Sequence, residues 1–523
     1  MQKSFYLLVT SFSLITTVLF SQSGTLDSTF NGVGIVRTDV ANHSTDFLYA
    51  LAIQPDQKIL AAGSVNITGH LDFALIRYLS DGSIDSDFGV NGLAQINFND
   101  GDDVCYGIAL QPDGKIVLVG TTQLKNLTEF AVARLNTNGT PDSTFGVAGK
   151  VISDLGSDYQ LPNDVALQTN GKIIAAGRYN YPGFAGSDFA MIRYNTDGEV
   201  DSTFGVNGIV LTGIHEEDEV KGIMIQPDGK IVLGGFASIS AKGDYAMVRY
   251  LEDGNVDKDF GIGGKVTTDL AGTGRSDYET CVLQDKDGKL VLGGNANYNT
   301  IEGLSDLGIV RYDKDGHLDQ GFANHGIFIL HLGDNSQMQA IVQQPDGKYL
   351  FAGKSNAVGA INQWLLARVT NDGELDTDFG DNGFVVTDMA SNYQVANSML
   401  LQNDTRIVVG GWNGDFNNSD FVLARYFADS TMTSGVTGLI HSFAFSISPN
   451  PCKDFISITL DKEFVSLQAF IVDASGRLLK SDVVNPGGSG KVTLNINQLP
   501  GGHYSLWLKD GEKWGQSSFV VMR

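Results

Sequence analysis

The residues best suited to chemistry are acids and aromatics that gather in a few loop segments of the chain. Carboxylate oxygens are the ligands that Ca²⁺ prefers, and flat rings beside polar groups pack well on sugars or on protein partners. The ligand-binding candidates are Asp102, Asp103, Glu216, Asp218, Asp277, Tyr179, Tyr181, Tyr298 and Trp412. They predict a binding site with Ca²⁺ as one candidate ligand, and ordinary solvated loops are the alternative interpretation.

Established catalytic patterns do not occur in the sequence. Its eight histidines are scattered, and it holds no HExxH metal motif, no Gly-x-Ser-x-Gly elbow and no phosphate-cradling loop. Acids far apart in sequence can still pair in a glycosidase, however. Three functions therefore stay open: a non-enzymatic binding or adhesion module, a glycan-active hydrolase or lyase that uses these acids, and a structural envelope protein. No catalytic residue and no metal-ligand set is assigned.

A phrase of the form Leu-Asp-x-x-Phe punctuates the chain and divides it into units of similar length. Seven copies follow one another at intervals of 56 to 62 residues, which indicates one structural unit copied in tandem. Its aspartates and phenylalanines are Asp27 and Phe30, Asp85 and Phe88, Asp142 and Phe145, Asp201 and Phe204, Asp257 and Phe260, Asp319 and Phe322, and Asp376 and Phe379. Because these residues recur in every unit, we expect them to be structural: the acid binds turn amides and the ring wedges between neighbouring units.

Each unit predicts four short antiparallel strands. In the first unit, residues 49–54 form an apolar strand, a Pro-Asp-containing turn follows, and residues 58–63 return as its partner. Residues 73–78 and 92–98 supply the third and fourth strands. Four strands repeated seven times predict an all-β fold, a seven-bladed β-propeller, because a β-helix has shorter rungs and an immunoglobulin-like array has longer domains.

The two ends of the repeat array predict how the ring closes. The last unit stops after residues 421–426 without a fourth strand, whereas a spare strand precedes the first complete unit. We therefore expect residues 33–39 to supply the outer strand of the seventh blade.

Antiparallel blades place alternate loops on opposite faces of the ring. The loops after strands one and three carry the repeated phrases, and we name their side the constant face. The loops after strands two and four differ from blade to blade and form the variable face, which carries all nine binding candidates. Variation confined to one face is typical of a scaffold with grafted specificity.

These phrases and their spacing resemble the delta-60 repeat family, an uncharacterised bacterial β-propeller repeat, over about residues 24–428. The resemblance implies a propeller outside the cytoplasm and no established reaction.

Composition and termini indicate export. The net charge of -25 argues against nucleic acid or anionic membrane as a partner, and the three cysteines are too few and too far apart for a disulfide framework. Residues 1–22, with Lys3 before an apolar run, are typical of a signal peptide, and no later segment is long and apolar enough to be transmembrane.

The tail is a separate domain in this interpretation. After a propeller at 23–428 and a linker at 429–442, residues 443–523 alternate in the manner of a small β-sandwich. The tail resembles the type A C-terminal sorting domain of type IX secretion substrates through Pro449, Asn450, Pro451, Gly476, Gly502 and Tyr504. That resemblance implies handling by the type IX secretion machinery and a location outside the cell or on its surface. A polysaccharide or a surface protein is the expected further partner.

Overall fold

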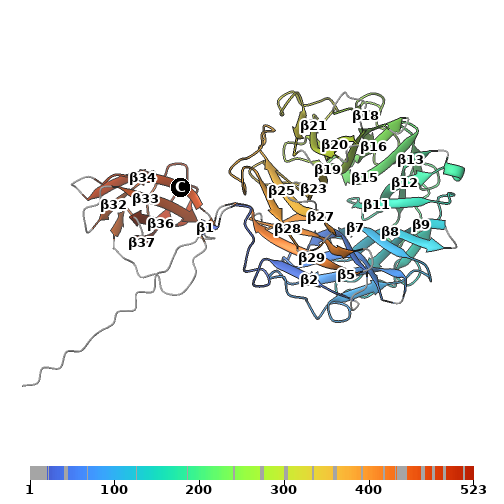
Figure 1. The fold of residues 1–523 in the computed structure, drawn as a ribbon, viewed down its shortest axis with the longest axis horizontal. Coiled ribbons are helices and arrows are strands. Elements are labelled where there is room, and N and C mark those ends of the chain that lie inside the picture. The colour runs from blue at the N-terminus through green and yellow to red at the C-terminus, as the bar shows by residue number, and fades with distance from the viewer. Residues whose placement is uncertain are drawn as a thin grey trace, which may run out of the picture. The chain divides into compact units, whose positions relative to one another are not determined.

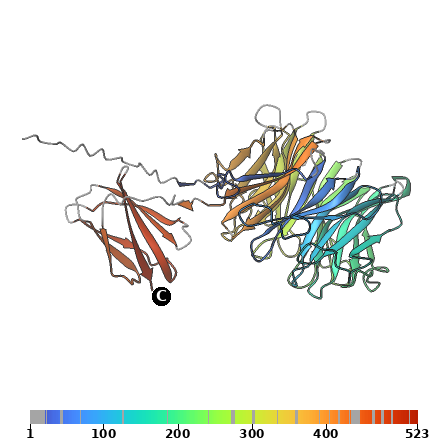
Figure 2. The same ribbon diagram turned by 90° about the horizontal axis from the view of Figure 1, so that it is seen from below.

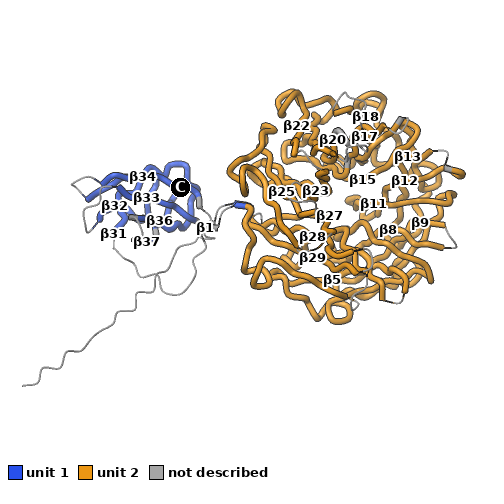
Figure 3. Tube along the Cα trace, in the orientation of Figure 1, with its two compact units in different colours: residues 1–23, 429–523 blue, residues 24–428 orange. Residues whose placement is uncertain are grey.

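The computed structural model divides the chain into two compact units, residues 24–428 and residues 1–23 with 429–523 (Figure 3). Within them the structure describes residues 20–21, 23–40, 45–67, 69–124, 127–184, 186–239, 242–270, 276–299, 304–332, 335–356, 362–389, 391, 393–403, 405–415, 418–429, 431–432, 445–460, 466–473, 478–486, 490–510 and 513–523. Most of the expected signal peptide and linker, and Gly476, lie outside these residues.

The larger unit is a seven-bladed β-propeller of four-stranded blades, which confirms the predicted fold class (Figures 1 and 2). The first three blades are β3 (Asp46–Ile53), β4 (Ile59–Asn66), β5 (Leu71–Tyr78) and β6 (Leu93–Ile96); β7 (Asp103–Leu110), β8 (Ile116–Leu124), β9 (Leu127–Leu135) and β10 (Lys150–Ser153); and β11 (Gln160–Leu167), β12 (Ile173–Asn180), β13 (Ser187–Tyr194) and β14 (Ile209–Thr212). The next three are β15 (Glu217–Ile225), β16 (Ile231–Ile239), β17 (Lys242–Tyr250) and β18 (Lys265–Thr268); β19 (Ser276–Gln284), β20 (Leu290–Asn299), β21 (Leu304–Tyr312) and β22 (Ile327–Leu330); and β23 (Gln337–Gln343), β24 (Tyr349–Ser355), β25 (Gln363–Val369) and β26 (Phe384–Thr387).

The seventh blade is built from both ends of the propeller and closes the ring as predicted. It contains β27 (Tyr393–Gln402), β28 (Arg406–Asp415), β29 (Asn418–Phe427) and, from the N-terminal side, β2 (Ile35–Thr38). Antiparallel pairing aligns Ile35 with Ala424 and Thr38 with Phe421. In the described part of the chain the one helical element is a short 3₁₀ turn, Pro182–Phe184.

Hydrophobic packing joins each blade to the next. Seven buried clusters fill the ring, and each draws its side chains from two adjacent blades, as Leu60 and Leu75 of the first blade pack with Leu118 and Ala133 of the second. One such cluster joins the seventh blade to the first and includes Phe30 and Val36 from the N-terminal segment. Since no blade has a complete core alone, its stability depends on both neighbours.

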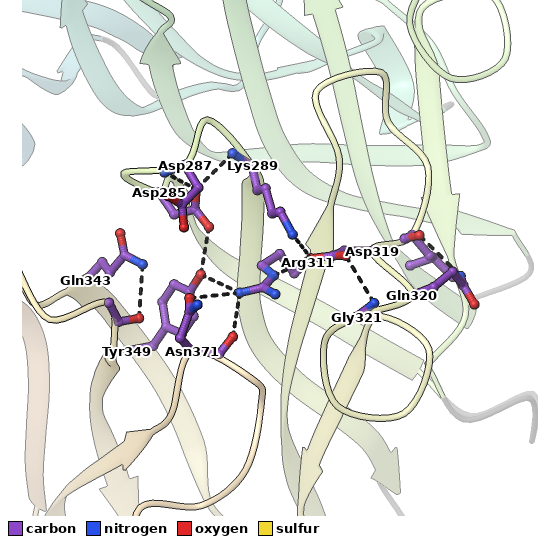
Figure 4. Close-up of polar contacts among 12 residues, drawn as sticks. Asp285, Asp287, Lys289, Arg311, Asp319, Gln320, Gly321, Gln343, Tyr349 and Asn371 are labelled. Carbon is purple, nitrogen blue, oxygen red and sulfur yellow. Dashed lines mark hydrogen bonds and ion pairs between the residues drawn. The ribbon is translucent and has the colours of Figure 1, made fainter.

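A buried arginine links each blade to the next on the constant face, and the fifth blade shows the arrangement in Figure 4. Arg311 on strand three donates from Nε to Asp319 at 2.7 Å, and Lys289 pairs with the same carboxylate. The Nη1 of Arg311 donates to the carbonyl of Asn371 in the sixth blade at 2.7 Å. The guanidinium also stacks 4.5 Å above the ring of Phe322. We name this arrangement the blade latch.

The latch recurs in every blade. Its arginine–aspartate pairs are Arg77–Asp85, Arg134–Asp142, Arg193–Asp201, Arg249–Asp257, Arg311–Asp319, Arg368–Asp376 and Arg425–Asp27. Burial alone would raise the pKa of these carboxyls, but hydrogen bonds and the neighbouring cations outweigh it and lower the pKa in all seven. The acids are therefore held ionised against their cations.

At the boundary between blades, a glycine leaves space for the phenylalanine side chain of the latch. Gly139 of the second blade adopts a φ of +87° and lies so close to Phe88 of the first that a Cβ would approach the ring to 2.8 Å. The turn consequently needs glycine both for its left-handed backbone and for space.

The smaller unit contains two packed sheets. One has β31 (Phe445–Ser448), β32 (Phe455–Leu460) and β35 (Lys491–Asn495), and the other has β33 (Leu467–Asp473), β34 (Leu478–Val484), β36 (Gly502–Asp510) and β37 (Lys513–Val521). Their shared core includes Ile456, Leu494, Leu506 and Phe519. A two-residue pair, β1 (Phe20–Ser21) with β30 (Thr431–Met432), also belongs to this unit.

Residues of the predicted sorting motif brace this sandwich. Asn450, between Pro449 and Pro451, accepts from the backbone amide of Val520 at 2.9 Å. Tyr504 donates to the carbonyl of Pro500 at 2.9 Å and stacks on Phe519 at 5.6 Å, while Gly502 begins β36. These contacts tie the motif to the last strand of the domain.

We expect Asp27→Ala to destabilise the seventh blade where the N-terminal segment closes the ring. The substitution leaves the buried Arg425 and its neighbour Arg406 without the carboxylate that both contact. Removing one partner of a buried ion pair costs about 3–5 kcal/mol, so the free energy of unfolding in urea should fall by about that amount. Asp56→Ala, at an acid whose side chain is 57% exposed, is the matched control and should change little. Equal stability of the two variants would contradict the closure role.

Candidate functional site

Strand one, the innermost strand of each blade, carries a β-bulge at the same place in all seven blades (Figure 1). A bulge re-aims the extra side chain out of the regular sheet alternation. The bulged residues, which we name the bulge ring, are Tyr49, Tyr106, Asn163, Lys221, Thr280, Gln339 and Asn397.

A glycine on strand two lies opposite each bulge and leaves space for it. A Cβ on Gly63 would come within 1.8 Å of the Phe47 carbonyl oxygen, and one on Gly411 would meet the Val395 carbonyl at the same distance. No side chain fits there, so the glycine of strand two and the bulge of strand one form one structural device.

Several bulge-ring side chains donate hydrogen bonds to the next blade along the inner edge of the propeller. Asn163 donates to the carbonyl of Val220 at 2.6 Å, Thr280 to that of Met338 at 2.9 Å, and Asn397 to that of Leu48 at 2.7 Å. The ring therefore surrounds the propeller axis, on the half of strand one that lies toward the variable face.

Aromatic rings form one side of this circle. Tyr49 and Tyr106 lie with their ring centroids 5.1 Å apart, and Phe47 contacts both Tyr49 and Trp412, the latter edge-on at 4.9 Å. Burial raises the pKa of Tyr49 to about 12 and that of Tyr106 further, so both phenols are neutral at physiological pH. The result is a chain of contacting rings in which Trp412 is buried and Phe47, Tyr49 and Tyr106 are half-buried.

Charged groups form another part of the circle. The buried carboxylate of Glu219 accepts from Arg178 at 3.3 Å and pairs with Lys221. Burial would raise the pKa of Glu219, but Lys221 and then Arg178 outweigh it and lower the pKa. We name the bulge ring together with Phe47, Trp412, Arg178 and Glu219 the channel mouth.

Three of the predicted binding acids, Asp103, Asp218 and Asp277, are buried and accept hydrogen bonds from the backbone. They accept from the amides of Phe98, His215 and Leu270 at 2.7, 3.1 and 2.8 Å, and so fix the loop that enters strand one. Burial raises the pKa of Asp103 to about 6. These acids therefore have a structural role at the entry to strand one, and their contact with a ligand stays a prediction.

The position of these acids recurs from blade to blade in the sequence, but the residue type at that position changes. Asp46 occupies the same place in the first blade and accepts from the amide of Val40 at 2.8 Å. Gln160 and Gln394 replace the acid in the third and seventh blades, where each side-chain oxygen accepts the equivalent amide. Aspartate and glutamine thus perform one task, which a search for recurring acids alone does not detect.

The remaining candidates are distributed over several blades. Asp102 is exposed and accepts from the amide of Leu71 at 2.9 Å, and Glu216 is exposed in the fourth blade. Tyr179 is buried against Tyr181, which is 39% exposed and donates to Asp188 at 2.7 Å. Tyr298 lies in β20, and its side chain is outside the described residues. Trp412 is the one candidate of the nine that belongs to the channel mouth.

Three carboxylates approach one another closely enough to hold a metal ion. Oxygens of Asp244, Asp269 and Asp277 lie within 4.8 Å of one another on the outer strands of the fourth blade and the entry to the fifth. Burial and the charge of Asp269 raise the pKa of Asp244. Hard oxygen ligands of this kind suit Ca²⁺.

Comparison with known proteins agrees with the repeat architecture. The family described as domain of unknown function (DUF5122) β-propeller matches residues 54–88, 111–145, 168–204, 226–260, 286–322, 344–379 and 402–432. The chain belongs to this β-propeller repeat family. A secretion system C-terminal sorting domain matches residues 446–522, which confirms the predicted type IX sorting tail.

Solved structures with a similar trace have distant sequences. A protein of unknown function from Dyadobacter fermentans is 10% identical with a TM-score of 0.39, over 75% of this chain and 99% of that one. The polysaccharide lyase Uly1 is 10% identical with a TM-score of 0.44, over 76% of this chain and 99% of that one. Sqt1 from Chaetomium thermophilum is 10% identical with a TM-score of 0.36, over 78% and 100%. No curated protein matches.

The sorting domain implies export, to the cell surface or the medium. Across the described residues, no helix has the length and apolarity needed to cross a membrane.

We expect Asp218→Ala to reduce stability rather than to remove a ligand contact. The change leaves the amides of Ile214 and His215 without their acceptor, which costs about 1–3 kcal/mol in the free energy of unfolding. Glu217→Ala, at the exposed neighbouring acid, should change stability by less than about 0.5 kcal/mol. Both are measured by urea unfolding. Unchanged stability of Asp218→Ala would return this acid to the binding candidates.

Proposed function

We propose that this exported propeller is a non-enzymatic binding or adhesion module that holds its ligand at the channel mouth. The observation that carries the proposal is the contrast between its two faces. Equivalent positions on the constant face repeat the same latch in all seven blades, whereas the bulge ring changes from tyrosine to asparagine, lysine, threonine and glutamine. The fold therefore does not require one residue type in the bulge ring, and this leaves those positions open to binding.

The acids weigh against the enzymatic alternative. A glycan-active hydrolase or lyase needs carboxyl groups that face a substrate, but Asp103, Asp218 and Asp277 are committed to backbone amides. The channel mouth instead offers aromatic rings and cations, and its carboxylate, Glu219, is already paired with Arg178 and Lys221, which favours binding without bond cleavage.

Export in two stages completes the proposal. Residues 1–22 act as the signal peptide, and the type IX machinery then recognises the tail and releases the propeller or attaches it to the surface. Both ends of the propeller lie together, since the amide of Gly24 donates to the carbonyl of Phe427 at 2.7 Å near the constant-face latch of Asp27.

The test is a carbohydrate array probed with the exported chain, scored for both binding and product. We expect at least one oligosaccharide to bind and none to be cleaved. The double variant Tyr49→Leu/Tyr106→Leu keeps apolar volume but removes both flat rings, and should weaken binding about 10-fold or more.

Ile262→Ala is the matched control because Ile262 is 90% exposed in the turn of a constant-face phrase. Its affinity should equal that of the parent chain. Product release would favour the enzyme, and an array without binding would favour the structural envelope protein.

A further inference from the structure

One strand-two position per blade lies at the level of the channel mouth, and in five blades its side chain contacts the next blade. It follows the glycine that faces the bulge, and its occupants are Ser64, Thr121, Arg178, Phe236, Asn295, Lys354 and Trp412. Ser64 accepts from the amide of Cys105 at 3.1 Å, and Asn295 accepts from that of Met338 at 3.0 Å. Arg178 pairs with Glu219, and the rings of Phe236 and Trp412 contact Tyr278 and Phe47.

Lys354 in the sixth blade departs from this pattern. Within the residues that the structure describes, no carboxylate or hydrogen-bond acceptor pairs with its ammonium group. The side chain is nevertheless half-buried, and burial lowers the pKa of Lys354. A cation taken partly out of water without a partner is costly, so its retention at this position points to an anion that joins it on binding.

The residues of the channel mouth, taken together with Lys354, carry a net charge of the opposite sign from that of the whole chain. The chain carries a net charge of -25, yet the channel mouth and Lys354 together contribute the cations Arg178, Lys221 and Lys354 against the single carboxylate of Glu219. Asp164, next to the bulge, accepts backbone amides from Val165 and Ile223, and burial raises its pKa to about 6. Because a pKa of about 6 leaves Asp164 ionised at pH 7, these three cations stand against two carboxylates, and this group of residues keeps one excess positive charge within an acidic chain.

The neighbouring rings restrict the kind of anion. Trp412 of the seventh blade lies one blade from Lys354, and through Phe47 it continues into the pair Tyr49 and Tyr106. Flat rings with hydroxyls suit a sugar ring, which has apolar faces and a polar edge.

We propose that the channel mouth binds a sugar that carries a carboxylate, and that Lys354 pairs with this carboxylate. The inference rests on the proposed binding function and gives its ligand a chemical class. Because the acidic chain repels long polyanions, the ligand is a short uronic-acid oligosaccharide or the end of a chain rather than the interior of a dense polyanion.

The test compares two disaccharides of matched shape by calorimetry on the full exported chain. Digalacturonic acid carries carboxylates where neutral galactobiose carries hydroxymethyl groups. A charge-assisted contact is worth about 1.5–3 kcal/mol, so the acid should bind roughly 10- to 100-fold more tightly. Lys354→Met should reduce this preference to nearly one while leaving galactobiose affinity unchanged, and Lys354→Arg should restore most of it.

Lys242→Met is the control, because Lys242 is an exposed lysine at the start of β17 on the same face. It should keep the preference of the parent chain. Lys354→Met should also melt no lower than the parent, since it removes a partly desolvated charge, and this separates binding from folding.

Each outcome decides the inference. Equal affinity for the two disaccharides, or a preference that survives Lys354→Met, overturns the carboxylate assignment but leaves a sugar-binding module intact. Failure of both disaccharides at millimolar concentration overturns it as well, and the carbohydrate array then decides separately whether the binding function stands.

Discussion

The rest of the propeller depends on the contacts that the latch arginine of strand three makes within its own blade and with the next blade. Its guanidinium is almost fully buried, so every one of its contacts must be supplied by protein. The aspartate that neutralises it lies in the same blade, but a carbonyl that it binds lies in the next, as Arg311 does with Asp319 and Asn371. A blade without its neighbour therefore has an unsatisfied cation as well as an incomplete core, and a closed ring satisfies both requirements.

This constraint explains the division between the faces. The latch needs arginine, aspartate, phenylalanine and glycine at fixed places around the turns of the constant face, and substitutions there lose stability. At the channel mouth the backbone needs only a bulge in strand one and a glycine opposite it, as at Gly63. The bulged side chain itself is free to be Tyr49 in one blade and Lys221 in another, so chemical variety can accumulate there at small structural cost.

The sequence was sufficient for the parts of the structure that repeat. Seven copies of one phrase predicted the blades, and the missing fourth strand of the last unit predicted the closure by residues 33–39, which β2 confirms. The bulge ring was not predicted, because a bulge is a feature of strand register, and the glycine that faces it on strand two identifies it only once the pairing of the strands is known. The backbone-binding task of Asp103 and Asp218 was not apparent from the sequence, because glutamine takes the place of aspartate at the equivalent positions Gln160 and Gln394. Lys354 stood out only once the partners of its six equivalents could be compared.

Closure of the ring by its own N-terminal strand is the central claim, and hydrogen exchange tests it most directly. Peptides that cover Ile35–Thr38 should exchange as slowly as those of β29, because their amides open only when the seventh blade, and with it the ring, comes apart. Asp27→Ala should accelerate both segments together. Exchange of Ile35–Thr38 orders of magnitude faster than that of β29 in the parent chain would show a frayed edge strand and contradict the latch-closed ring.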